Sequence, residues 1–361
     1  DLRTRKNSVI GELVWSYAKE NRTFNAGYRG AFGFLRSDLS GSGVTNVRTG
    51  RQRLYGEYSS RHGSFSYRVS LGAENNMKAG DDGFSRFAFS PTVLLSYRLN
   101  KRNMLRLRLD SETSMPDIQQ MSGNRILIME NFYRRGNAEV HNSTGYQSRL
   151  IYSYNIPRKL IVQTDAHYNR TAGFLYDAFV QDGDAWYLET RNAHRFSEAG
   201  MNMIVTYIPW KWLRLGVDVS ADRQTIKETS SGEAFSDWFF PVYLNASAVW
   251  GNWSLSCRQT FGGKMLDGLY RKGLEKVSYL SLTYGWKNWQ FGAQCLFPFY
   301  DDKYSNETVS FAPVRHVTQT NLRTKNREFG FTISWFFQRG KENHSAKSLE
   351  NSDVDSGVFR F

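Results

Sequence analysis

The chain has 361 residues, a formal net charge of +13, 15% aromatic residues and a mean hydropathy of −0.55. It has no uninterrupted apolar run of about 18 residues, which excludes a transmembrane helix. Its basic residues are spread along the chain instead of forming one cluster, which argues against nucleic acid as a partner.

Apolar and polar side chains alternate with a period of two residues over much of the chain. The stretch 105–110 reads LRLRLD, and the stretch 213–222 reads LRLGVDVSAD. A charge at every second position cannot be buried in an ordinary core without partners. A strand with one apolar face and one polar face suits a wall between lipid and water, which is the pattern of an outer-membrane barrel.

Short polar turns divide the alternating runs into hairpins, at Lys19–Arg22, Arg61–Gly63, Asn100–Asn103, Ile156–Lys159, Pro209–Lys211, Gly251–Asn252 and Lys287–Asn288. Around these turns we predict strands at 8–18, 23–35, 48–60, 64–74, 84–99, 104–111, 146–155, 160–170, 197–208, 212–224, 238–250, 253–262, 275–286, 289–299 and 326–337. Their lengths, mostly about 9 to 15 residues, match tilted membrane strands. The predicted fold class is all-β: an antiparallel up-and-down transmembrane β-barrel with about 15 strands.

The connections between hairpins are longer and polar, such as QDGDAW and KETSSGEAFSD. Short turns on one side and long loops on the other are typical of bacterial outer-membrane barrels, where the short turns are periplasmic. Aromatic residues gather beside the short turns and predict a girdle at that membrane interface, for example Trp15, Tyr154, Trp210, Trp253 and Trp286.

An odd number of strands is unusual, because single-chain bacterial barrels have even numbers. The N-terminus also shows neither a Met nor an apolar signal-peptide core. Together these features favour the C-terminal part of a larger barrel, with 1–337 as barrel wall and 338–361 as a periplasmic C-terminal tail. We therefore expect the strands at 8–18 and 326–337 not to pair, which leaves an open, strongly curved sheet.

Two elements of the segment 111–154 resemble TonB-dependent receptors of Bacteroidota type. Their Pro-x-Ile-x-x-Leu element is matched by Pro116, Ile118 and Met121, and their Gly-Asn-Pro-x-Leu element by Gly136, Asn137 and Val140. Met121 and Ala138 depart from the usual Leu and Pro. The end of the chain, FGFTISWFFQ, is similar to the family's aromatic last strand.

This resemblance implies energised uptake of a scarce solute, such as an iron chelate, a cobalamin-like molecule, a glycan or a peptide. It also implies a barrel of about 22 strands around an N-terminal plug, a TonB-type energy coupler and a surface lipoprotein as partners. The net positive charge is complementary to the anionic groups of outer-membrane lipid and lipopolysaccharide. Two alternatives stay open: a passive porin-like channel, and a soluble carbohydrate-binding β protein.

The sequence shows no catalytic constellation and no cofactor motif, so we expect a transporter and not an enzyme. His167 alternates in step with Gln163 and Asp165, so its side chain is expected to point into the lumen. We interpret it as a polar side chain in contact with water, because one strand supplies too few ligands for a metal. Cys257 and Cys295 have the apolar phase of strands separated by one other strand, which predicts two free thiols facing lipid.

Candidate ligand-binding residues come from two places. The extracellular loops offer Phe132, Tyr133, Trp186 and Trp238, since loops carry binding in such scaffolds. The lumen phase offers Arg106, Arg108, Arg214 and Asp218. The plainer alternatives are loop packing for the aromatic rings and a hydrated wall of compensating charges for the lumen residues.

Overall fold

In the computed structural model of the chain, the described residues are 2–39, 43–79, 84–121, 125–261, 263–273, 277–299, 304–310, 317–322 and 327–337. The expected tail at 338–361 lies outside them. Among these residues, no helix is long and apolar enough to cross a membrane.

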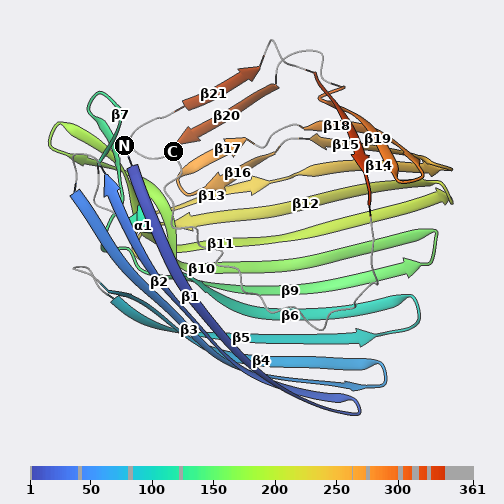
Figure 1. The fold of residues 1–361 in the computed structure, drawn as a ribbon, viewed down its shortest axis with the longest axis horizontal. Coiled ribbons are helices and arrows are strands. Elements are labelled where there is room, and N and C mark those ends of the chain that lie inside the picture. Colours follow the sequence, from blue (N-terminus) through green and yellow to red (C-terminus); the bar gives the residue numbers. More distant parts are fainter. Residues whose placement is uncertain are drawn as a thin grey trace.

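Fifteen strands follow one another in chain order as a single antiparallel, curved sheet (Figure 1). They are β1 (Leu2–Lys19), β2 (Arg22–Leu39), β3 (Gly43–His62), β4 (Phe65–Ala79), β5 (Phe84–Arg98), β6 (Asn103–Ser114), β9 (Ser143–Ile156), β10 (Leu160–Asp182), β11 (Ala185–Trp210), β12 (Leu213–Lys227), β14 (Val242–Trp250), β15 (Trp253–Phe261), β18 (Ser278–Trp286), β19 (Trp289–Leu296) and β22 (Glu328–Trp335).

The shorter elements lie at the end of the sheet away from the tight turns. Three of them join the large sheet: β7 (Ile126–Met129), β8 (Phe132–Arg135) and β13 (Ala234–Phe239). A separate small sheet holds β16 (Lys264–Asp267), β17 (Tyr270–Gly273), β20 (Tyr304–Ser310) and β21 (Val317–Leu322), and α1 (Ile118–Met121) is one helical turn.

All seven predicted turns and all fifteen predicted strands are confirmed, although several strands, such as β1, β3 and β4, extend further at the loop end than predicted. The strand expected at 238–250 is divided into β13 and β14 at Phe240-Pro241, where proline removes a backbone donor from the ladder. The expected loop QDGDAW is instead a tight turn at Gly183-Asp184, because β10 and β11 continue as a hairpin as far as the pair Asp182–Ala185.

The register assigns alternate residues to opposite faces of the wall. On the convex face, the side chains of Leu215 and Val217 stay 40% and 38% exposed, whereas Asp222 on the other face is 6% exposed. Cys257 and Cys295 both pair with Leu280 on the intervening β18, and both are free thiols, as predicted. Polar side chains thus line the concave face, which we call the lumen face, and apolar side chains cover the outer face.

The sheet does not close on itself. Among the described strands, β1 pairs only with β2, and β22 pairs only with β19. β22 runs back toward the tight-turn edge, where Trp335 lies opposite Trp289. The expectation that the first and last strands remain unpaired with each other is therefore confirmed.

The two faces of β12 allow a matched test of the alternation. Replacing Leu215 with Arg on the outer face should cost about 2–4 kcal/mol of stability near the bilayer midplane. Replacing Ser220 with Arg should cost much less, because Ser220 lies on the lumen face. Urea unfolding of the full-length protein in vesicles measures both values, and equal losses would contradict the assignment of faces.

The difference in connection length predicts sidedness. An epitope inserted at Gly232–Glu233 should bind antibody on intact cells that carry the full-length protein, because this position lies in the long connection that follows β12. The same epitope at the tight turn Gly251–Asn252 should bind only after the outer membrane is opened. Antibody binding in the reverse order would overturn the orientation of the strands.

Candidate ligand site on the lumen face

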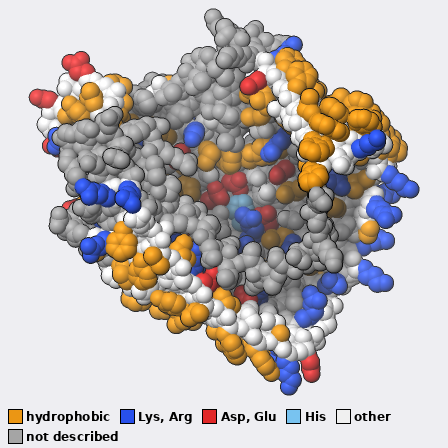
Figure 2. All heavy atoms as spheres, viewed as in Figure 1, with side chains coloured by type: hydrophobic (Ala, Val, Ile, Leu, Met, Phe, Trp, Pro, Cys, Tyr) orange, Lys and Arg blue, Asp and Glu red, His pale blue; other side chains and the backbone are white. Residues whose placement is uncertain are grey.

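The floor of the lumen is charged. Figure 2 shows acidic and basic side chains, with a histidine among them, at the bottom of the hollow, while apolar side chains gather at the upper right and lower left of the molecule. This arrangement follows from the register, since every second residue of β9 to β12 points into the same space.

A histidine and three carboxylates from three neighbouring strands meet at this floor. His167 on β10 lies with Nδ1 3.1 Å from Asp165 Oδ2 and with Nε2 3.1 Å from Asp222 Oδ1 on β12. Glu198 on β11 lies 3.6 Å from the same Nε2 atom. The side chains of His167 and Asp165 are only 7% and 5% exposed. The expectation that His167 is merely solvated is therefore wrong.

Further polar groups hold the cluster in place. Asn169 and Gln224 donate hydrogen bonds of 3.1 and 2.7 Å to the two oxygens of Glu198. Gly200 lies under Asp222, and a Cβ atom there would come within 1.9 Å of Asp222 Oδ1. Buried ionisable groups are stable only with such partners. Within the described residues, no group of three or more His, Cys, Asp or Glu side chains is arranged to hold a metal ion.

A cavity of about 430 Å³ opens against the lumen face of β1 to β4, next to the end of β6. Arg51 in its wall forms an ion pair of 2.9 Å with Glu74. Arg29 and Arg53 are directly opposite each other on β2 and β3. Glu112 and Asp117 supply acidic groups from the β6 side. The cavity can therefore take polar solutes of mixed charge.

The loop aromatics of β8 are held by packing against the hairpin of β10 and β11. β8 pairs in parallel with the edge of β11, so that Phe132 and Tyr133 lie opposite Trp186 and Tyr187. The ring of Phe132 lies 5.9 Å from that of Phe179, and the ring of Tyr133 lies 5.6 Å from that of Tyr187. These two predicted ligand-binding rings therefore already have ring partners.

Basic side chains of β8 form ion pairs with acidic residues of β10 and β11. Arg135 bonds to Glu189 at 2.6 Å and to Asp182 at 3.3 Å, and Arg134 bonds to Asp177 at 3.0 Å. Burial alone would lower the pKa of Arg135, but the two carboxylates outweigh it and the pKa of the guanidinium is raised.

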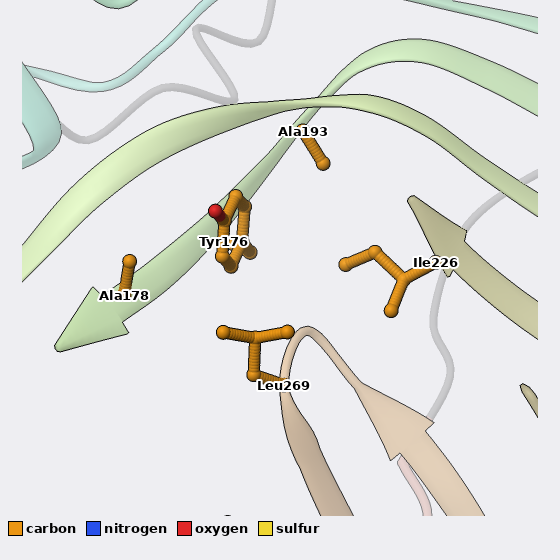
Figure 3. Packing of buried hydrophobic residues seen from close by; sticks show 5 residues of the cluster. All are labelled: Tyr176, Ala178, Ala193, Ile226 and Leu269. Atoms are coloured by element: carbon orange, nitrogen blue, oxygen red, sulfur yellow. The ribbon is translucent and has the colours of Figure 1, made fainter. Parts of the chain in front are cut away.

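A hairpin folds over the lumen face above the charged floor. Leu269, in the turn between β16 and β17, packs against Tyr176 and Ala178 of β10 and Ile226 of β12 (Figure 3). The turn needs Gly268, which has φ +61° and leaves 3.0 Å between the position of a Cβ atom and Cβ of Tyr176. The backbone N–H of Leu266 donates to Gln224 at 2.8 Å, and Arg271 forms an ion pair with Asp237.

Two tyrosines beside this hairpin stay protonated at neutral pH. Burial, together with the hydrogen bond to Glu228, raises the pKa of Tyr176 well above its usual range. Burial, followed by the charge of Asp177, raises the pKa of Tyr270 to about 12. The hydroxyl group of Tyr176 is engaged as the donor to Glu228.

The other predicted site residues are spread over the wall. Arg106 and Arg108 lie on the lumen face of β6, where Arg108 forms an ion pair of 2.7 Å with Asp110. Arg214 and Asp218 lie on the lumen face of β12, which is separated from β6 by the three strands β9, β10 and β11. Trp238 lies opposite Arg223 on the outer face, stacked on Phe240 at 5.6 Å. The eight residues therefore do not form one site.

Sequence reasoning grouped His167 with Asp165 but not with Glu198 or Asp222, because it took residues 181–186 for a loop and so left the register of β10 on β11 open. The tight turn at Gly183-Asp184 sets the register of β10 on β11, which places His167 opposite Gly200. The pairing of β11 with β12 then places Gly200 opposite Asp222. The inward fold of the β16–β17 hairpin has no local signal in the sequence, because it depends on contacts between distant residues.

The charged floor gives a prediction about stability. Replacing His167 with Ala should destabilise the full-length protein by about 3–5 kcal/mol, because three carboxylates lose the group between them. Replacing the exposed His194 should change stability by no more than about 0.5 kcal/mol. Unfolding in detergent measures both. Adding Asp222→Asn to His167→Ala should restore part of the loss, and a double variant less stable than the single one would contradict this account.

Comparison with known proteins places this geometry in a family. A model of the outer membrane protein beta-barrel family matches residues 17–335. A search of curated proteins finds no significant match. Solved structures of TonB-dependent receptors share the fold. The siderophore receptor PirA from Pseudomonas aeruginosa is 12% identical with a TM-score of 0.61. The FrpB iron transporter from Neisseria meningitidis is 11% identical with a TM-score of 0.65, and the copper transporter OprC is 12% identical with a TM-score of 0.68.

These structures cover most of this chain but are themselves longer. PirA, FrpB and OprC cover 82%, 91% and 93% of the chain, whereas the chain spans 54%, 55% and 59% of their lengths. At such low identity the likeness establishes the fold. The family match, over most of the chain, agrees with the apolar outer face and the polar lumen. The chain belongs to the outer membrane protein beta-barrel family and is integral to the outer membrane.

Proposed function

We propose that the chain forms part of the barrel wall of a TonB-dependent receptor that imports a scarce solute with energy supplied by a TonB-type coupler. The observation that carries this proposal is a charged lumen, partly covered by an inward-folded hairpin, inside an apolar wall. In this proposal, the full-length protein also contains a plug domain, and the coupler is a separate partner. A surface lipoprotein assists capture of the solute.

The polar character of the lumen supports a charged or strongly hydrogen-bonding solute. Charges of both signs line the cavity against β1 to β4. The structural neighbours are a siderophore receptor, an iron transporter and a copper transporter. We infer that a metal chelate is the first class to test, followed by cobalamin-like molecules, glycans and peptides.

Among the candidate residues, Arg106 is the one with an unused hydrogen-bond donor that a ligand could accept. Its Nε atom is buried on the lumen face and has no hydrogen-bond partner among the described residues, and an unmet buried donor of this kind is costly. We propose that Arg106, with Arg108, Arg214 and Asp218, contacts the solute or the plug. Phe132, Tyr133 and Trp186 form the extracellular aromatic rim in this proposal, and Trp238 is left out because it lies on the outer face.

Uptake by cells separates an energised receptor from a passive porin. Cells that carry the full-length protein as their sole receptor should accumulate a radiolabelled ferric hydroxamate, ferric catecholate or cobalamin above the external concentration. A protonophore, or loss of the coupler, should abolish this accumulation. Equilibration that resists both treatments, with swelling of liposomes in sugar solutions, would contradict the proposal and favour a porin.

A lumen variant tests the site itself. With the solute that cells accumulate, Arg106→Gln should raise the concentration for half-maximal uptake by about tenfold, because it removes a charged donor. Arg102→Gln, at the tight turn after β5, is the matched control and should leave uptake unchanged. Equal uptake by both variants would remove Arg106 from the proposed site.

A further inference from the structure

Four basic residues gather on the outer face of β10, β11 and β12, beyond the apolar band. They are Arg170, Arg195, Arg223 and Lys227, and we call them the outer basic patch. Arg223 lies opposite Ala199 on β11, and Arg195 lies opposite Lys227. Their phase is that of Leu215 and is opposite to that of Asp222, so they do not point into the lumen.

The height of the patch follows from the length of the apolar band. On β12 the outer phase is apolar from Leu213 to Ala221, a stretch of nine residues, and Arg223 is the next outer residue. Nine or so tilted residues cross the hydrocarbon core of an outer membrane, whose apolar band on barrels is about 25 Å tall. Since Leu213 adjoins a periplasmic turn, the patch lies at the headgroup level of the outer leaflet.

The patch has no internal counter-charge. Within the described part of the chain, none of its four side chains forms an ion pair, and the Nε atom of Arg195 has no hydrogen-bond partner. Arg195 and Lys227 are directly opposite on adjacent strands, an arrangement that destabilises a sheet by itself. The nearby acids Glu198, Asp222 and Asp237 belong to the lumen phase.

Amphipathic groups border the patch on the membrane side. Tyr168 and Trp238 are the outer residues of the same row as Arg223 on β10 and β13. They are 46% and 51% exposed, and Phe240 stacks on Trp238. Tyr and Trp prefer the border between hydrocarbon and headgroups. Between the cations, the hydroxyls of Thr225 and Ser236 lie 2.9 Å apart.

We propose that the outer basic patch binds the phosphate groups of an outer-leaflet glycolipid, lipopolysaccharide. Guanidinium groups bind phosphate through paired charge-assisted hydrogen bonds, and a phosphate between Arg195 and Lys227 would turn their repulsion into attraction. The exposed aromatic rings would pack on the sugar and acyl region. A lipid fits better than an acidic protein, because the patch adjoins the apolar band on the face that lipid covers.

Lipid-dependent stability tests this proposal. The full-length protein is delipidated in uncharged detergent, and its unfolding temperature is followed by electrophoretic mobility as purified lipopolysaccharide is added. The midpoint of the wild type should rise and saturate. In the double variant Arg195→Gln and Lys227→Gln, half of the rise should need about ten times more lipopolysaccharide. Without lipid, the double variant should unfold at the same or a higher temperature, because the repulsion is gone.

Controls identify the chemistry and the place. Lys211→Gln, at a periplasmic turn, should respond as the wild type does, and dephosphorylated lipopolysaccharide should give no rise. A wild-type response from the double variant would overturn the proposal, and is the result expected if the patch instead served an acidic surface protein. A full rise with inorganic phosphate alone would also overturn it, as would a double variant that unfolds at a lower temperature without lipid.

Discussion

The whole structure depends on one constraint: in lipid, every backbone N–H and C=O group needs a partner within the protein. Strands meet it only through their neighbours, so a sheet must continue from strand to strand without a gap. From β1 to β22 the long strands do so in chain order, each antiparallel to the one before. With the backbone paired in this way, side chains are free only to alternate, one outward to lipid and one inward to water.

That alternation explains why charged residues can be so frequent in an apolar environment. The lumen face collects them, and neighbouring strands bring them into contact, as with His167, Glu198 and Asp222. The cluster stays stable because hydrogen bonds from Asn169 and Gln224 supplement the charges. On β12 the same alternation places a cation on the outer face where the apolar band ends, at Arg223.

Much of the fold could be predicted from local sequence, because strand phase and turn chemistry are local properties. Gly251-Asn252, for example, marks its turn with a glycine at φ +54°. The extracellular elements could not be predicted in this way. The parallel pairing of β8 with β11 and the packing of Leu269 on Tyr176 depend on residues far apart in the chain. The site was therefore predicted as separate residues, while the cluster at His167 required the register.

Accessibility along β12 tests the central claim most directly. Single nitroxide labels at successive positions from Leu213 to Gln224, in the full-length protein with Cys257 and Cys295 replaced by Ala, report contact with lipid or water in vesicles. Access to oxygen should peak at every odd position up to Ala221, and access to a water-soluble nickel complex should peak at the even positions. A profile without a two-residue period, or with the phases exchanged, would contradict the account.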